Sequence, residues 1–156
     1  MNTNHRDYLS WKRYNVTLRG IETSIDKSNN AGASLGTGLY TCCLSNRTMA
    51  RKYGSVYYVV NGKPKNPIKF QYQYQAENES HDYEEEFQFL KKIFSFITHY
   101  PLDRMEFLKY CLLSQGYDGI LIKGREMVNY KPENVLYFRT EQELKEYYYW
   151  GTIKTD

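Results

Sequence analysis

The stretch GYDGILIKGREMVNY, residues 116–130, decides the fold class of this chain. It holds two short runs rich in apolar and β-branched residues, Gly119–Ile122 and Glu126–Tyr130, on either side of Lys123-Gly124-Arg125. Because so short a connection containing glycine favours a tight turn, we expect two antiparallel strands here. The stretch therefore predicts a β-hairpin whose second strand begins at Glu126.

Upstream of this hairpin, several segments also carry strand patterns. Asn15–Ile21 and Ile68–Gln75 alternate apolar and polar residues, and Ser55–Val60 is a run of β-branched and tyrosine residues. Asn61-Gly62, which follows that run, is a strong hairpin signal. Gly36–Thr41 has the form of a glycine-hinged entry into a short strand. These patterns predict a protein with a substantial sheet.

The middle and the end of the chain show helical patterns. Residues 84–99 place Phe87, Leu90, Phe94 and Ile97 at helical spacing, and we expect this apolar stripe to lie in the core. Capping signals mark the starts of the other helices and glycines mark two of their ends. The expected helices are Asn46–Tyr53 capped by Ser45, Glu84–His99, one from Asp103 to Gly116, and Glu141–Trp150 with Thr140 and Glu143 as its capping box.

The order of these elements indicates an α+β domain. A last strand is expected at Val135–Phe138, so strands precede and follow the helical middle. We expect helices packed on a strongly bent antiparallel sheet. With 156 residues and no internal repeat or linker, residues 1–156 should form a single domain.

Composition disfavours some classes of function and leaves others open. The net charge is +3 and the basic residues are scattered, whereas a nucleic-acid-binding protein usually shows a basic stripe. The three cysteines and three histidines lack zinc-binding spacing, so we expect no metal. No apolar run opens the chain, which predicts a cytoplasmic protein without a signal peptide or membrane contact.

Three short clusters on different expected strands carry the strongest functional signal. The first is Arg19-Gly20 at the end of a strand, and the second is Gly36–Tyr40, followed by a helix that ends in Tyr53-Gly54. The third is Glu126–Val135, a glutamate followed by apolar and aromatic residues and then a proline turn. In this order and spacing, the clusters resemble the motifs of the ADP-ribosyltransferase superfamily, which includes poly(ADP-ribose) polymerases, diphtheria-type toxins and small phage transferases.

The resemblance covers most of the chain and implies a bent, split antiparallel sheet, NAD as co-substrate and no metal. Glu126 would stabilise the positive charge on the ribose as nicotinamide leaves, and Tyr40 would stack on the nicotinamide ring. The remaining positions would bind NAD. Arg19 would contact the phosphates or the adenosine ribose of NAD, and the Gly20 backbone would approach the carboxamide. Ser45 or Thr48 would form hydrogen bonds with NAD, and Tyr53 would form a second wall of the nicotinamide slot.

The resemblance leaves several readings open. Arg19 matches the Arg-Ser-Glu subgroup, whereas Tyr40 matches the His-Tyr-Glu subgroup. Arginine-modifying relatives carry Glu or Gln two residues before the catalytic glutamate, and here that residue is Gly124. We expect a mono-ADP-ribosyltransferase whose acceptor is a macromolecule, with a protein as the first candidate and a nucleic acid as the second. The alternatives are an NAD glycohydrolase and a catalytically inactive module of the same fold that binds NAD or a partner.

Overall fold

The computed structural model describes residues 5–22, 34–97 and 102–150 of the chain. Within these residues the sheet has seven strands in the order β4-β5-β6-β2-β1-β3-β7. In chain order the strands are β1 (Val16–Ile21), β2 (Leu39–Cys42), β3 (Ser55–Val60), β4 (Ile68–Phe70), β5 (Gly119–Ile122), β6 (Glu126–Asn129) and β7 (Leu136–Phe138).

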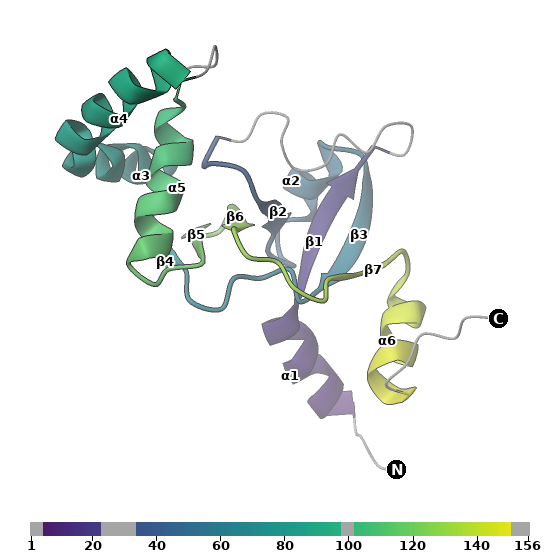
Figure 1. Cartoon of the computed structure of the whole chain (residues 1–156). Helices are drawn as coiled ribbons and strands as arrows, with labels where there is room; N and C mark the ends of the chain where they lie inside the picture. Colours follow the sequence, from purple (N-terminus) through teal and green to yellow (C-terminus); the bar gives the residue numbers. More distant parts are fainter. Residues whose placement is uncertain (1–4, 23–33, 98–101, 151–156) are drawn as a thin grey trace.

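Helices accompany this sheet, and the α+β class predicted from the sequence is confirmed. Figure 1 shows α3, α4 and α5 gathered at one end of the molecule and α1 and α6 at the other. The helices are α1 (His5–Asn15), α2 (Arg47–Arg51), α3 (Gln73–Ser80), the 3-10 turn η2 (His81–Tyr83), α4 (Glu84–Ile97), α5 (Arg104–Ser114) and α6 (Glu141–Trp150).

The sheet is mixed and is narrowest at its centre. β4 and β5 run parallel, so the prediction of a wholly antiparallel sheet is wrong at this edge, whereas the other described pairs of strands are antiparallel. β1 and β2 are aligned at a single pair, Leu18 with Cys42, and every other described pair of neighbouring strands is aligned at three or more positions. The sheet therefore consists of two parts joined by a narrow junction.

The hairpin predicted at Asn61-Gly62 does not form. Asn61 has the positive φ of 63° that such a turn requires, but β3 pairs with β1 and β7, and β4 pairs with β5. A Cβ atom on Gly62 would lie 3.4 Å from side-chain atoms of both Thr17 and Thr41. The β3–β4 connection therefore passes close over β1 and β2. Because the chain crosses the sheet here, β4 pairs with β5 at the edge of the sheet opposite β7.

The strand predicted over Ile68–Gln75 is shorter than expected, because α3 begins inside it. The Gln75 side chain accepts hydrogen bonds from the backbone N–H groups of Gln71 (2.8 Å) and Tyr72 (2.9 Å). These bonds satisfy donors just before the helix and favour its start. Local alternation of apolar and polar residues therefore predicts the correct strand start and the wrong strand end.

Among the described residues, three apolar clusters form the core, and they lie between the sheet and the helices. α3 and α5 cover β5 and β6, α2 covers β1, β2 and β3, and α1 and α6 cover the far ends of β1, β3 and β7. The sequence patterns do not predict α1. Tyr8 on α1 is only 1% exposed and packs on Tyr148 and Tyr149 of α6, so the two terminal helices stabilise each other.

The prediction that the apolar stripe of α4 lies in the core is wrong for most of its length. Phe87 is buried against Phe107 of α5, but Leu90, Phe94 and Ile97 are 38%, 37% and 74% exposed. α4 lies at the edge of the molecule (Figure 1), where little of the fold can cover it. The predicted end of this helix at His99 lies outside the described residues. None of the described helices is both long and apolar enough to cross a membrane.

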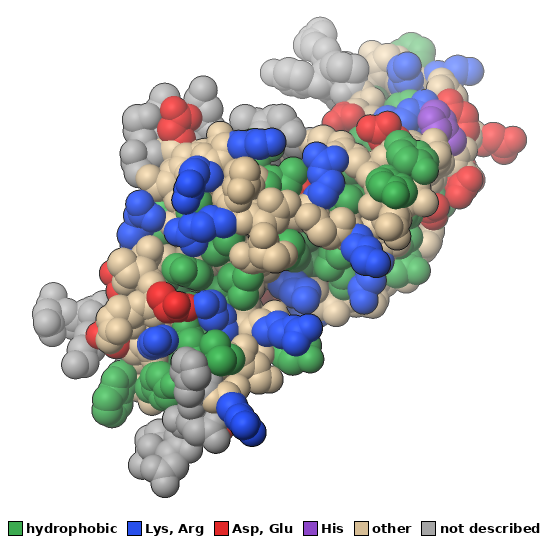
Figure 2. Space-filling view, turned by 180° about the vertical axis from the view of Figure 1, so that it is seen from behind, with side chains coloured by type: hydrophobic (Ala, Val, Ile, Leu, Met, Phe, Trp, Pro, Cys, Tyr) green, Lys and Arg blue, Asp and Glu red, His purple; other side chains and the backbone are tan. Residues whose placement is uncertain are grey.

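Basic side chains are spread over one face of the molecule. Figure 2 shows Lys and Arg on much of the rear face, with hydrophobic side chains between them, while acidic side chains gather toward the α3 and α4 end. This distribution agrees with the scattered basic residues of the sequence.

Candidate active site

The strands that carry the three motifs are neighbours at the centre of the sheet. β6 pairs with β2, and β2 pairs with β1 (Figure 1). Glu126 is aligned with Cys42, and Cys42 is aligned with Leu18, the residue before Arg19. Residues at opposite ends of the sequence are therefore brought to adjacent positions, at the narrow junction between the two parts of the sheet.

Glu126 is the first residue of β6, as the sequence predicts, and follows a turn in which Gly124 has a φ of 71°. Its carboxyl group is half-buried, and burial raises its pKa, an effect that the charge of Arg125 partly offsets. Within the described residues, no side chain or backbone group forms a hydrogen bond or ion pair with this carboxylate. No described donor therefore holds or blocks this carboxylate.

The negative charge of Glu126 acts on its neighbours across the strands. Burial, with a smaller contribution from Glu126, raises the pKa of the Cys42 thiol to about 11. Burial also raises the pKa of the Tyr40 hydroxyl, and Glu126 contributes to that shift as well. Residue patterns do not predict Cys42 as a site residue; only the register of β2 against β6 places it beside Glu126. Both groups remain protonated at neutral pH beside the carboxylate.

Tyr40 is half-buried, and its hydroxyl is bound to the loop that precedes β2. It accepts a hydrogen bond from the Leu35 N–H (2.9 Å) and donates one to the Gly36 carbonyl. Tyr130 supports the same loop by donating to the Leu35 carbonyl at 2.6 Å. The Tyr40 side chain therefore positions the loop that precedes β2, through its bonds to Leu35 and Gly36.

α5 fixes the other side of this loop. Glu106 accepts a hydrogen bond from the Thr37 N–H, and Lys109 donates to the Thr37 hydroxyl at 2.8 Å. α5 is capped by Asp103, whose side chain accepts a hydrogen bond from the Met105 N–H at 3.2 Å. The contact between Glu106 and Thr37 spans 69 residues, so no local signal in the sequence could reveal it.

Arg19 reaches toward β2, but its side chain starts on the other face of the sheet from Glu126. Side chains alternate along a strand, so Arg19 lies opposite Leu18 and therefore opposite Cys42 and Glu126, which share the face of Leu18. The Arg19 guanidinium donates a hydrogen bond to the Tyr40 carbonyl at 3.0 Å. The structure thus brings Tyr40 and Glu126 to one face and links Arg19 to Tyr40 through the backbone.

Gly20 lies against the end of α2. A Cβ atom there would be 1.8 Å from the Ala50 carbonyl oxygen and 3.1 Å from Cβ of Tyr53. The absence of a side chain is therefore required for α2 to pack on β1. This close approach holds α2, with the predicted residues Ser45, Thr48 and Tyr53 in and around it, against the strand that carries Arg19.

α2 is capped by Asn46, so the prediction of Ser45 as its N-cap is wrong. The Asn46 side chain accepts from Met49 N–H (3.3 Å) and donates to the Gly124 carbonyl (3.0 Å), in the turn just before Glu126. Asn is as good an N-cap as Ser, so residue type alone could not separate the two. Asn46 ties α2 to the turn that positions Glu126.

The other residues predicted on α2 lie on its surface. Ser45 is exposed, with its hydroxyl 3.1 Å from the Cys43 sulfur, and Thr48 is exposed on the first turn. Tyr53 is 60% exposed just after the helix. These three side chains are open to a ligand, and among the described residues no hydrogen bond joins them to Tyr40 or Glu126.

Chemically, this arrangement offers one carboxylate, without a described partner, beside a protonated thiol and a phenol. Among residues 5–22, 34–97 and 102–150, no cluster of three or more His, Cys, Asp or Glu side chains could hold a metal ion. Compared with known proteins, the chain matches no family model, and no curated protein or solved structure is significantly similar to it.

Proposed function

We propose that this protein is a mono-ADP-ribosyltransferase of the cytoplasm, which cleaves NAD and transfers ADP-ribose to a macromolecular acceptor. The observation that supports this most is the adjacency of β6, β2 and β1, because it brings the three motif segments side by side at the sheet centre. The narrow junction at Leu18 and Cys42 also fits a split sheet.

The proposed chemistry uses the carboxylate of Glu126. As the bond between nicotinamide and the ribose C1′ breaks, its electron pair leaves with nicotinamide and positive charge develops on the ribose. A half-buried carboxylate to which no described group is bonded is well suited to stabilise this charge. The lone pair of an acceptor then forms the new bond to C1′, and the acceptor loses its proton to solvent.

Most of the residues proposed to contact NAD lie on one face of the sheet, but Arg19 does not. Tyr40 and Glu126 share a face of the sheet, and Ser45, Thr48 and Tyr53 are exposed on and beside α2, which covers the same face. Arg19 begins on the opposite face, so its proposed contact with the phosphates would require the ligand to pass the sheet junction. Gly20 faces the Ala50 carbonyl, so only its remaining backbone atoms could meet the carboxamide.

The test is release of nicotinamide from NAD by Glu126→Gln, which keeps the shape of the side chain and removes its charge. We expect the rate to fall at least about a hundredfold, as for the loss of one electrostatic stabiliser. Glu85→Gln, at an exposed position of α4, is the matched control and should retain full activity. Equal rates of nicotinamide release by the wild type and a folded Glu126→Gln variant would show that Glu126 has no role in the reaction.

A second candidate function is an inactive module that binds NAD or a partner. It is favoured by the hydrogen bonds that Tyr40 and Arg19 already make within the protein, since these bonds alone could explain both residues. Calorimetric titration with NAD, combined with the release assay, separates the two: binding without nicotinamide release supports the inactive module. Labelled ADP-ribose found only as the free sugar nucleotide would instead indicate a glycohydrolase.

A further inference from the structure

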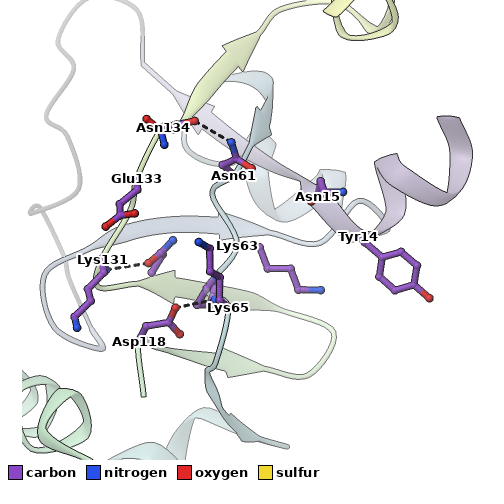
Figure 3. Close-up of a pocket in the computed structure, with 11 residues that line it drawn as sticks. Tyr14, Asn15, Asn61, Lys63, Lys65, Asp118, Lys131, Glu133 and Asn134 are labelled. Carbon is purple, nitrogen blue, oxygen red and sulfur yellow. Dashed lines mark hydrogen bonds between the residues drawn. The ribbon is translucent and has the colours of Figure 1, made fainter. Parts of the chain in front are cut away.

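Figure 3 shows residues that line a pocket of about 510 Å³. Its walls come from the β3–β4, α5–β5 and β6–β7 connections, the end of β6 and the junction of α1 with β1. None of the residues proposed for catalysis or NAD binding lines it. The pocket is thus a separate candidate site.

The lining of this pocket carries more positive than negative charge. Lys63, Lys65 and Lys131 contribute ammonium groups, and Asp118 and Glu133 contribute carboxylates. The Asp118 oxygens accept hydrogen bonds from the backbone N–H groups of Lys65 (2.7 Å) and Asn66 (2.8 Å), so backbone donors already use them. In the part of the chain that the structure describes, no ion pair joins the three lysines to a carboxylate. Their charge is therefore available to an anion.

Side-chain amides hold the two connections that carry these lysines. Asn129, only 4% exposed, donates to the Gly62 carbonyl (3.3 Å) and accepts from the Lys131 N–H (2.9 Å). Asn61 donates to the Asn134 carbonyl at 3.0 Å, and both of these residues have a positive φ. Figure 3 shows the bond between Asn61 and Asn134, which joins the two connections. The two backbone segments are therefore fixed relative to each other before any ligand arrives.

We propose that this pocket binds the phosphate groups of a single-stranded nucleic acid. Ammonium groups are usual donors to phosphate oxygens, and three lysines meet in this pocket, on connections that the asparagine amides hold in place. Tyr14, which is 66% exposed, lies at the same pocket and offers a flat ring on which a base can stack. A concave site of this volume admits one or two nucleotides of a flexible strand, whereas a duplex would rest on its rim. The inference does not depend on the use of NAD.

The experiment measures fluorescence anisotropy of a labelled single-stranded oligonucleotide of about 12 residues, as DNA and as RNA. Affinity is followed between about 50 and 200 mM salt. Lys63→Gln/Lys65→Gln should weaken binding and reduce the salt slope by about 0.7 for each phosphate that the variant no longer neutralises. Lys69→Gln/Lys92→Gln removes the same charge at exposed positions outside the pocket and should keep the wild-type slope. Tyr14→Ala should weaken binding about tenfold.

Two further measurements make the outcome decisive. Glu126→Gln should bind the oligonucleotide as tightly as the wild type, so failure of the NAD proposal and failure of this one are distinguishable. Competition by inorganic phosphate or a mononucleotide at the same concentration of phosphate groups would show an anion site without preference for a strand, and would overturn the proposal. The absence of binding, or equal salt slopes for the two double variants, would overturn it as well.

Discussion

Gly20→Ala should destabilise the protein, because the added methyl group has no space. Its carbon would lie 1.8 Å from the Ala50 carbonyl oxygen and 2.9 Å from the Ala50 carbonyl carbon. Both are backbone atoms at the end of α2, so no rotamer change can relieve the clash, and α2 must move away from β1. Overpacking of this kind costs about 1–3 kcal/mol. For a domain of this size, that cost corresponds to a fall in the unfolding temperature of about 2–12 °C.

Thermal unfolding followed by circular dichroism measures this effect. Gly116→Ala is the informative control, since a Cβ atom there meets nothing within 4 Å, but its φ of 94° disfavours alanine. That variant reports backbone strain alone, whereas Gly20→Ala reports steric exclusion. Ala50→Gly in the Gly20→Ala background should not restore stability, because the clashing atoms belong to the backbone. An unfolding temperature of Gly20→Ala equal to that of the wild type would refute the close packing of α2 on β1.

Three other substitutions test separate features. Thr41→Val should stabilise the fold by about 1 kcal/mol in urea unfolding, because the buried Thr41 hydroxyl has no described hydrogen-bond partner; a loss of stability would reveal a partner. Tyr40→Phe should cost about 1–3 kcal/mol through the unpaired Leu35 N–H, yet retain NAD affinity in calorimetry if the ring stacks. The Arg104 guanidinium lowers the pKa of Glu84 from 4.5 to about 2. That stabilisation is present above pH 4.5 and is lost toward pH 2, so Glu84→Gln should flatten the dependence of unfolding temperature on pH across this window.

Local signals in the sequence predict most of the elements but not their partners. Ser55–Val60 is a strand with the predicted bounds, because β-branched residues specify an extended backbone locally. Asn61 has the backbone conformation that its turn signal predicts, yet β4 lies at the other edge of the sheet. Strand pairing depends on contacts between residues that are far apart in the sequence. The apolar stripe of α4 likewise predicts a helix and its apolar face, but not whether the fold covers that face.

In the candidate site, too, local sequence signals predict some features, whereas others depend on how distant strands pair. Glu126 at the start of a strand could be predicted from the glycine turn before it, and this placement is what the structure shows. The opposite orientation of Arg19 and Glu126 follows from the register of β1, β2 and β6, which no residue pattern specifies. Cys42 and Asn46 enter the site only through that register and through the contact of α2 with the Gly124 turn.

The half-buried carboxyl of Glu126 yields a prediction that connects stability with function. Burial raises its pKa in the folded protein above the ordinary value of 4.5, so at neutral pH the ionised group destabilises the fold. This penalty disappears as the pH falls through the raised pKa and below 4.5, where the carboxyl is protonated in both the folded and the unfolded state. Glu126→Gln should therefore be more stable than the wild type at about pH 7, and the two should converge in stability toward acid pH.

On the proposed mechanism, nicotinamide release by the wild type should fall over the same acid range, because only an ionised carboxylate would stabilise positive charge on the ribose. Urea unfolding at several pH values, in parallel with the release assay, checks both effects, and Glu85→Gln should follow the wild type in each. A residue retained only for structure has no reason to destabilise the fold at the pH where it is ionised. A Glu126→Gln variant that is less stable than the wild type at about pH 7 would show that the carboxylate has a stabilising partner, and the argument for an unpaired catalytic charge would fail.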